Sequence, residues 1–170
     1  ITVENSGSGT ALRLVDLPPP LFEPDEVVIE VAAAGVNRAD LLQRAGKYPP
    51  PPGASPILGL EAAGVIAEVG NRVSGWNVGD KVCALLSGGG YSNAVAVPHQ
   101  MLMPLPEGWS FEKGAAFPEA YYTAFLNLFI EGGLKQGETV LIHGGASGVG
   151  TAAIQLAKAN SAKILVTAGS

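Results

Sequence analysis

The segment Thr139-Val-Leu-Ile-His-Gly-Gly-Ala-Ser-Gly-Val-Gly-Thr-Ala-Ala-Ile-Gln-Leu-Ala-Lys158 decides which fold to expect. A short apolar run at 140–142 leads into a glycine-rich turn, and an amphipathic stretch follows without a break. Glycine lets the backbone adopt positive φ and approach a ligand closely, and the free amides and dipole at a helix start favour an anion. A second apolar run at 164–167 completes a β-α-β pattern. The segment therefore predicts the first β-α-β unit of a dinucleotide-binding fold.

The glycine-rich turn matches the G-x-G-x-x-G spacing with one substitution. Gly145, Ser147 and Gly150 occupy the three glycine positions, and Gly148 stands beside them. The alternative is a tight turn with no ligand, because glycine-rich turns between strands and helices are common. The strand before the turn and the helix after it favour a nucleotide site. The residues expected to contact the cofactor here are Gly145, Ala146, Ser147, Gly148, Val149 and Gly150.

The end of the second strand bears on which nucleotide is bound. NAD-binding folds usually place Asp or Glu about 20 residues after the glycines, where it holds the ribose 2′-hydroxyl. Residues 165–170 contain no acidic side chain, and Gly169 and Ser170 leave room for a 2′-phosphate. NADP(H) is therefore the expected cofactor, with Gly169 and Ser170 close to it.

The composition predicts a globular chain. Of its 170 residues, 47% are hydrophobic and 15% are charged, and the net charge is −5. An acidic balance without a basic patch argues against a nucleic-acid partner. No apolar run reaches the roughly 18 residues of a membrane span, and the first residues lack the pattern of a secretion signal. The single cysteine, Cys83, excludes an internal disulfide and suits a reducing, cytoplasmic location. Its place in an apolar strand indicates packing rather than chemistry.

Short strands separated by glycine and proline are expected over the first part of the chain. Strands are predicted at 12–17, 27–34, 62–69, 81–86 and 92–97, and helices at 38–44 and 118–130. This spacing is typical of a compact, irregular β-barrel. The fold class is α/β plus β, with domains at 1–115 and 116–170. A doubly wound sheet needs about five or six strands, whereas this chain supplies two, so we expect it to be part of a longer protein.

Several motifs together carry a family resemblance. They are Ala-Ala-Gly-Val-Asn-Arg-Ala-Asp (33–40), Gly-Leu-Glu-Ala-Ala-Gly (59–64), Val-Gly-Asp-Lys-Val (78–82), Pro-Glu-Ala-Tyr-Tyr-Thr-Ala-Phe (118–125) and the glycine-rich turn. With them, the chain resembles the medium-chain dehydrogenase/reductase superfamily in its zinc-free quinone oxidoreductase branch. The loop at 43–55 is most similar to the subgroup related to the tumour-suppressor-induced quinone oxidoreductase. The resemblance implies a GroES-like β-barrel catalytic domain followed by the start of a Rossmann domain, NADPH as cofactor and a homodimer.

Departures from the zinc alcohol dehydrogenases of the same superfamily bear on the chemistry. Those enzymes carry a cysteine ligand where this chain has Asn37, a histidine where it has Leu60 and a further cysteine near Glu119. An amide, an aliphatic side chain and one carboxylate cannot form a tetrahedral zinc site. Without a Lewis acid, oxidation of an unactivated alcohol is not expected. A quinone or a conjugated carbonyl, which accepts hydride readily, is the expected substrate.

The resemblance also implies site residues, each of which has a plainer structural interpretation. Asn37 is expected to contact the nicotinamide or the substrate, and Asp40 to fix local hydrogen bonds, although either residue could simply cap a short helix. Tyr48 would line the substrate pocket or be an exposed loop aromatic. Ser147 would reach the cofactor or substrate, or be a small residue in place of glycine. Thr123 would lie near the nicotinamide carboxamide, or bond back to its own helix.

Three further polar residues receive structural interpretations. Glu61 is expected to be a partly buried structural carboxylate rather than a catalytic one. His143, at the end of an apolar strand, is expected to be a core histidine with a satisfied ring nitrogen. His99, in a loop after a proline, is expected to face water.

The expected function is transfer of reducing equivalents from NADPH to a quinone or activated carbonyl, in a cleft between the two domains and without a metal. The protein would align donor and acceptor. One alternative is an enoyl-thioester or enone reductase of the same fold, which needs a residue able to protonate the α-carbon. Another is a non-catalytic member that binds NADPH.

Overall fold

The computed structural model describes residues 1–6 and 9–169. Ser170, expected near the cofactor, lies outside the described residues. The chain divides into two compact units, Ile1–Pro118 and Glu119–Ser170. In the described part of the chain, no helix combines the length and apolar character needed to cross a membrane.

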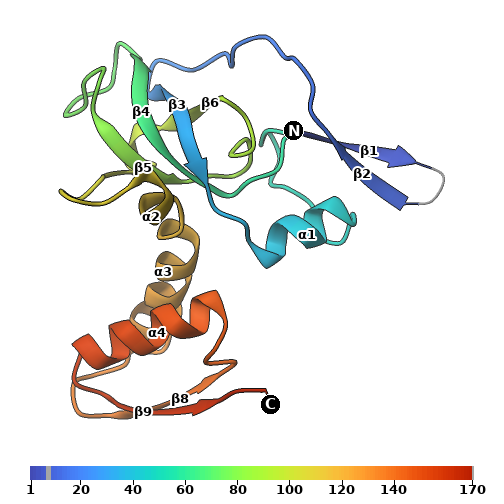
Figure 1. The fold of residues 1–170 in the computed structure, drawn as a ribbon. Helices are drawn as coiled ribbons and strands as arrows, with labels where there is room; N and C mark the ends of the chain where they lie inside the picture. The colour runs from blue at the N-terminus through green and yellow to red at the C-terminus, as the bar shows by residue number, and fades with distance from the viewer. Residues whose placement is uncertain (7–8, 170) are drawn as a thin grey trace. The chain divides into compact units, whose positions relative to one another are not determined.

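The first unit is built on an antiparallel sheet (Figure 1). Its hydrogen-bonded order is β6-β3-β4-β5-β7, with bounds β3 (Glu26–Ala34), β4 (Glu61–Val69), β5 (Lys81–Leu85), β6 (Ala94–Pro98) and β7 (Leu102–Pro104). Among the described residues no ladder joins the edges β6 and β7. The strand spacing predicted a compact, irregular β-barrel, and in the described residues its ladders form one five-stranded sheet with β6 and β7 as the edge strands.

Successive side chains along the strands point alternately to the two faces of this sheet, and apolar side chains are present on both. Ala62 pairs with Ala84, and the next pair along the ladder is Ala63 with Cys83. The first pair belongs to the main core of valine, isoleucine and leucine side chains. The second pair belongs to a smaller cluster on the opposite face. Successive strand residues point to opposite faces, so this sheet is covered on both.

The opposite face is covered by the short helix α2 (Phe111–Ala115). Ala115 packs against Ala63 and Cys83. A Cβ on Gly114 would overlap Leu105 and lie 3.3 Å from the Cβ of Ala63, so glycine allows the helix to approach the sheet closely. The expectation that Cys83 is a packing residue is confirmed, because its side chain is fully buried.

The N-terminal segment differs from the prediction of a strand at 12–17. The structure has a hairpin, β1 (Thr2–Ser6) paired with β2 (Gly9–Arg13), so the second strand ends at Arg13. Residues 14–23 have no regular structure, because the prolines at 18–20 have no N–H to donate to a ladder. By contrast, the predicted helix at 38–44 is confirmed at both ends as α1 (Arg38–Arg44).

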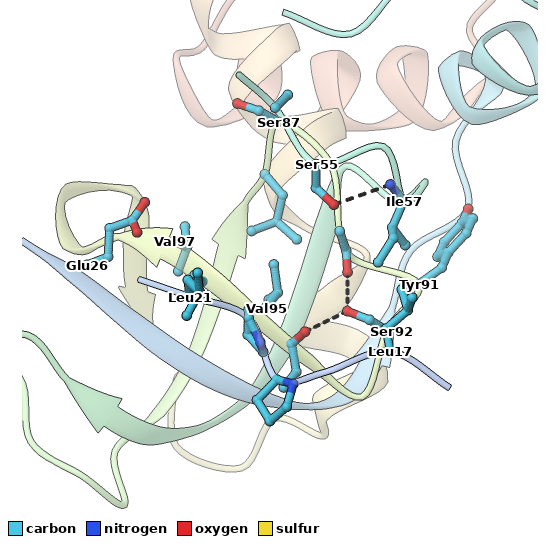
Figure 2. A pocket seen from close by; sticks show the side chains of 18 of the residues that line it. Leu17, Leu21, Glu26, Ser55, Ile57, Ser87, Tyr91, Ser92, Val95 and Val97 are labelled. Carbon is cyan, nitrogen blue, oxygen red and sulfur yellow. Dashed lines mark hydrogen bonds between the residues drawn. The ribbon is translucent and has the colours of Figure 1, made fainter. Parts of the chain in front are cut away.

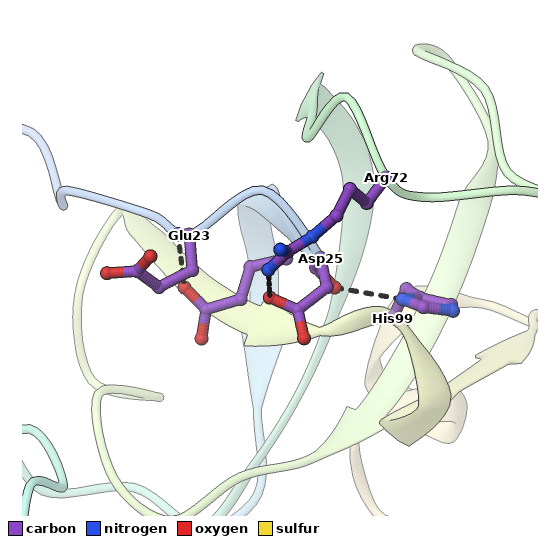
Figure 3. Close-up of polar contacts among 5 residues, drawn as sticks. Glu23, Asp25, Arg72 and His99 are labelled. Atoms are coloured by element: carbon purple, nitrogen blue, oxygen red, sulfur yellow. Dashed lines mark hydrogen bonds and ion pairs between the residues drawn. The ribbon is translucent and has the colours of Figure 1, made fainter.

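The turn before β3 is held by polar contacts with two other segments (Figure 3). The carbonyl of Asp25 accepts a hydrogen bond from the backbone N–H of His99 at 3.2 Å and lies 2.9 Å from its Nδ1. The carboxylate of Asp25 lies 3.5 Å from Nη2 of Arg72, in an exposed ion pair that adds little stability. His99 begins the 3-10 helix η1 (His99–Met101) and is half-buried. The prediction that it faces water is therefore met only in part.

The second unit contains a parallel β-α-β arrangement. Strands β8 (Thr139–His143) and β9 (Lys163–Thr167) pair in parallel, and α4 (Gly148–Ala159) connects them (Figure 1). Small side chains on one side of α4, those of Ala152 and Ala153, pack against Ile142 of β8. The strand–turn–helix–strand order predicted from 139–167 is confirmed.

The helix predicted at 118–130 changes its hydrogen-bonding pattern midway. It is an α-helix as α3 (Pro118–Phe125) and continues as the π-helix η2 (Leu126–Glu131). The amide of Asn127 donates to the carbonyl of Thr123 at 2.8 Å, and its own carbonyl accepts from Gly132 at 3.0 Å. Apolar periodicity predicted the helix but not this widening, which depends on local hydrogen bonds.

Candidate functional site

The N-terminus of α1 brings together two of the predicted site residues. Asn37 is the N-cap residue, in extended conformation, and Asp40 is at the third helical position. Oδ2 of Asp40 accepts a hydrogen bond from the backbone N–H of Asn37 at 2.7 Å. This is the return bond of a capping box, in which the side chain at N3 binds the N-cap amide. The capping interpretation of Asp40 is therefore observed.

The side chain of Asn37 reaches a buried carboxylate on the sheet. Its Nδ2 donates to Oε1 of Glu61 at 2.8 Å, and Glu61, the first residue of β4, is only 3% exposed. The prediction that Glu61 is a structural carboxylate agrees with this burial. Gly35 makes room for it, because a Cβ there would overlap Oε1 of Glu61 and lie 2.7 Å from the carbonyl of Ala115.

Tyr91 completes this network and was missed by the sequence analysis. It lies in the loop between β5 and β6, and its hydroxyl donates to Oδ2 of Asp40 at 2.9 Å. Burial raises the pKa of Tyr91 above its ordinary value, and its hydrogen bond to Asp40 and the nearby charges of Asp40 and Glu61 act in the same direction. The sequence showed only a glycine-rich turn ending in a tyrosine, and nothing local connects that turn with a helix 51 residues away.

No hydrogen bond among the described residues joins Tyr48 to this network. It follows α1 in a proline-rich loop, and its side chain is 46% exposed. This position corresponds to the exposed loop aromatic that was the alternative to a pocket-lining role.

Tyr91 is also one of the residues that line a large cavity (Figure 2). Its volume is about 1160 Å³. It is bounded by the irregular segment at 14–21, the loops at 51–57 and 85–89 and strand β6. Ser92 lines it and donates from its hydroxyl to the carbonyls of Gly89 and Ala94. None of the first-unit site residues expected from the sequence is among its lining residues.

The glycine-rich turn of the second unit starts α4. Ser147 is the N-cap residue, and its Oγ accepts from the N–H of Gly150 at 3.0 Å. The sequence predicts Ser147 either as a cofactor contact or as a small residue in place of glycine, and this capping role was not predicted. The spacing of serine and glycine just before an amphipathic stretch was the available sign.

Free backbone amides remain at this helix start. The N–H groups of Gly145, Ser147, Gly150 and Thr151 are used within the turn, on acceptors in residues 144, 147 and 167. Within the described residues, no acceptor pairs with the N–H groups of Ala146, Gly148 and Val149. These three residues are exposed. The first amides of a helix have no partner inside it and, with the dipole, favour an anion.

The glycines of the turn have different structural roles. Gly144 has φ +68°, and a Cβ on Gly150 would overlap the Gly144 carbonyl, so these two positions require glycine for the fold itself. Gly145 is buried against Val166 of β9. Gly148 is different, since a Cβ there would meet nothing within 4 Å. The fold alone does not explain a glycine at 148, and close approach by a ligand would explain it.

The other predicted residues of this unit are placed as follows. Thr123 is half-buried on α3, and its backbone carbonyl accepts from Asn127. Gly169 is exposed after β9. His143 is also exposed, so the core interpretation was wrong, although its Nδ1 lies 3.1 Å from Oγ1 of Thr167. That threonine hydroxyl also lies 3.4 Å from the N–H of Gly144 and connects β9 with the turn.

The residues at the zinc-ligand positions of the first unit do not suit a zinc ion. Leu60 is buried and has no donor atom, and Asn37 uses its amide group on Glu61. In the part of the chain that the structure describes, no group of three His, Cys, Asp or Glu side chains is arranged to hold a metal.

Comparison with known proteins gives matches over nearly the whole chain. The chain is 42% identical over 166 residues to the phenolphthiocerol synthesis polyketide synthase type I Pks15/1 of Mycobacterium marinum, and the match covers 95% of this chain and 8% of that protein. It is 38% identical over 172 residues to the quinone oxidoreductase of Mus musculus, covering all of this chain and 52% of that protein.

The solved structures that match include a quinone oxidoreductase and an enoyl reductase. The quinone oxidoreductase from Thermus thermophilus, whose structures include a complex with NADPH, has a TM-score of 0.80 at 40% identity, covering 99% of this chain and 52% of that one. The CurK enoyl reductase has a TM-score of 0.81 at 35% identity, covering 94% and 50%.

The chain spans about half the length of the quinone oxidoreductases that it matches. The family model for the alcohol dehydrogenase GroES-like domain matches residues 23–107, which include the sheet, α1 and the network of Asn37, Asp40, Glu61 and Tyr91. The chain therefore belongs to the alcohol dehydrogenase GroES-like domain family, within the medium-chain dehydrogenase/reductase superfamily.

Proposed function

We propose that the protein to which this chain belongs is an NADPH-dependent, zinc-independent reductase of quinones or activated carbonyl compounds. The observation that carries the proposal is the start of α4, where three exposed amides have no partner among the described residues and Gly148 leaves open space. The second unit is then the start of a Rossmann domain, and residues 145–150 hold the pyrophosphate of the nucleotide.

The choice of NADPH over NADH rests on the end of β9. Residues 165–169 carry no carboxylate that would repel a 2′-phosphate, and Gly169 is exposed, with nothing within 4 Å of the position of its Cβ. The quinone oxidoreductase of Thermus thermophilus, 40% identical to this chain, has been crystallised with NADPH. Both observations support NADPH.

The absence of suitable zinc ligands among the described residues supports an acceptor that needs no Lewis acid. When bound, NADPH supplies a hydride. A quinone or conjugated carbonyl accepts it without metal activation, whereas an unactivated alcohol–carbonyl pair needs more polarisation. Asn37 is then the residue that contacts the nicotinamide or the substrate, and Asp40 and Glu61 hold it. Tyr48 or water supplies any proton.

Reduction of an enoyl thioester is the second candidate. It is favoured by the identity of 42% to a polyketide synthase and by the structural match to the CurK enoyl reductase. Such a reaction needs a proton donor for the α-carbon. In the first unit, the hydroxyl of Tyr48, whose residue is 46% exposed, is the candidate, because that of Tyr91 is engaged with Asp40.

Oxidation of NADPH by the full-length protein distinguishes the two candidates. We expect turnover with a 1,4-benzoquinone at a rate that exceeds turnover with a crotonyl thioester, and no loss of activity after treatment with a chelator. Faster turnover of the thioester would favour the second candidate. No turnover with either acceptor, or activity that depends on stoichiometric zinc, would reject the proposal.

A further inference from the structure

The backbone around Tyr91 is fixed by the neighbouring loop, independently of α1. Three consecutive backbone N–H groups donate hydrogen bonds to carbonyls of the loop at 57–59. Gly89 donates to Ile57 at 2.7 Å, Gly90 to Gly59 at 3.0 Å and Tyr91 to Leu58 at 2.9 Å. Gly59 has φ +104°, and a Cβ on it would lie 2.7 Å from the Tyr91 nitrogen. Only glycine allows this close approach. The start of the Tyr91 side chain therefore has a fixed position.

From this position the Tyr91 hydroxyl reaches the Asp40 carboxylate, whose other donor among the described residues is Asn37. Figure 2 shows the Tyr91 ring extending away from Ser92 and Val95. Oδ2 of Asp40 accepts from both the Tyr91 hydroxyl, at 2.9 Å, and the Asn37 backbone N–H, at 2.7 Å. The other oxygen, Oδ1, is buried and has no hydrogen-bond partner among the described residues. The orientation of the carboxylate thus depends on these two donors.

We propose that Tyr91 is a positioning residue, which fixes the Asp40 carboxylate and through it the N-cap residue Asn37. The proposal rests on the proposed function, in which Asn37 contacts the nicotinamide or the substrate. Glu61 holds the Asn37 side chain at 2.8 Å, and Asp40 holds its backbone at 2.7 Å. Without the Tyr91 hydroxyl, Oδ2 keeps only the bond from the Asn37 N–H among the donors of the described residues, so the acceptor for the Asn37 backbone is less firmly fixed.

The hydroxyl suits this role because it remains a donor. Burial and the adjacent carboxylate raise the pKa of Tyr91 above its ordinary value of 10.0, so the proton stays on the phenol throughout the neutral range. A phenylalanine would fill the same space without the bond. Tyr91→Phe is therefore a clean test, and Ser92→Ala is the matched control. Ser92 is the next residue, and its hydroxyl binds loop carbonyls rather than Asp40.

The first measurement is a double-mutant cycle on kcat with the full-length protein, using Tyr91→Phe, Asn37→Ala and the double variant. Misplacement of an aligned group reduces rates by up to about 100-fold, and we expect Tyr91→Phe to reduce kcat about tenfold, with the KM for NADPH changed less than about twofold. If Tyr91 acts through Asn37, the double variant is no slower than Asn37→Ala. Ser92→Ala keeps the kcat of the natural protein. Multiplicative effects in the double variant would overturn the proposal.

The second measurement does not depend on turnover. Hydrogen–deuterium exchange over residues 36–41 of the full-length protein reports on the bond from the Asn37 N–H to Asp40. We expect exchange to be at least about fivefold faster in Tyr91→Phe and unchanged in Ser92→Ala. Unchanged exchange in Tyr91→Phe would by itself reject the proposal. If neither acceptor is reduced, the proposed function fails, and this measurement alone decides the role of Tyr91.

Discussion

The side-chain amide of Asn37 donates a hydrogen bond to Oε1 of Glu61 over 2.8 Å, joining the start of α1 to the first residue of β4. The carboxylate is 3% exposed. A hydrogen bond to a buried charged group contributes more than a neutral surface bond, and an unpaired partner is costly. The Asn37–Glu61 pair is therefore a structural support for the proposed site.

Removing this carboxylate should destabilise the chain. Glu61→Ala is expected to lower the free energy of unfolding by about 2–4 kcal/mol, because it leaves a cavity and an unpaired amide on Asn37. Glu61→Gln keeps an acceptor oxygen at the same position and should cost only about 1 kcal/mol. Urea unfolding of the full-length protein measures both values. A Glu61→Ala variant as stable as the natural protein would show that the pair contributes nothing.

Ser147 allows helix capping and nucleotide binding to be tested separately. Ser147→Ala removes the acceptor for the Gly150 N–H and should cost about 1 kcal/mol of stability. Ser147→Asp keeps a good cap and a favourable charge at the helix start, so its stability should match that of the natural protein. Its carboxylate would repel a pyrophosphate, and we expect NADPH affinity to fall at least about tenfold.

A bulky substitution, Ser147→Trp, is expected to abolish NADPH binding in a fluorescence titration. Natural affinity in both Ser147→Asp and Ser147→Trp would contradict the assignment of this turn to the cofactor.

Gly148 and Gly150 form a matched pair for the same question. A Cβ at 148 meets no atom within 4 Å, so Gly148→Ala should leave stability unchanged or raise it by up to about 1 kcal/mol. The same methyl group would occupy space that the phosphate needs, and NADPH affinity should fall about tenfold or more. Calorimetry gives both quantities for the full-length protein.

Gly150→Ala should behave in the opposite way. Its Cβ would overlap the carbonyl of Gly144, so we expect a loss of about 2 kcal/mol or more in unfolding free energy, before any effect on binding. A Gly150→Ala variant of natural stability would contradict the close packing seen in the turn.

Cys83 makes stability depend on alkaline pH. Burial raises the pKa of its thiol from 9.0 to about 11, and the nearby charge of Glu61 acts in the same direction. Above pH 9 the unfolded chain releases this proton while the folded chain retains it, so stability falls between about pH 9 and pH 11. We expect Cys83→Ala to remove this part of the decline. Labelling of the thiol at pH 8 should require unfolding, and rapid labelling of the folded protein would contradict the assignment.

Local patterns predicted those elements whose cause is local. Helix α1 begins and ends where its cap and glycine signals indicated, and the turn before α4 follows its glycines and serine. The strand predicted at 12–17 was wrong. The prolines that follow disfavour a strand over this segment, and the pairing of β1 with β2 decides that β2 ends at Arg13. The strand predicted from Ser92 begins at Ala94, because the Ser92 hydroxyl binds the neighbouring carbonyls.

The sequence by itself determined the β-α-β unit and the helix start at Asn37 and Asp40, because each depends on residues close together in the chain. The mismatch with zinc ligands followed from the family resemblance together with the chemistry of the side chains at those positions. Only the tertiary structure decided that Glu61 supports Asn37 from 24 positions away and that Tyr91 supports Asp40 from 51 positions away. These bonds depend on how strands and loops distant in sequence are brought together. No local pattern contains that information, since a buried hydrogen bond forms wherever packing places a donor beside an acceptor.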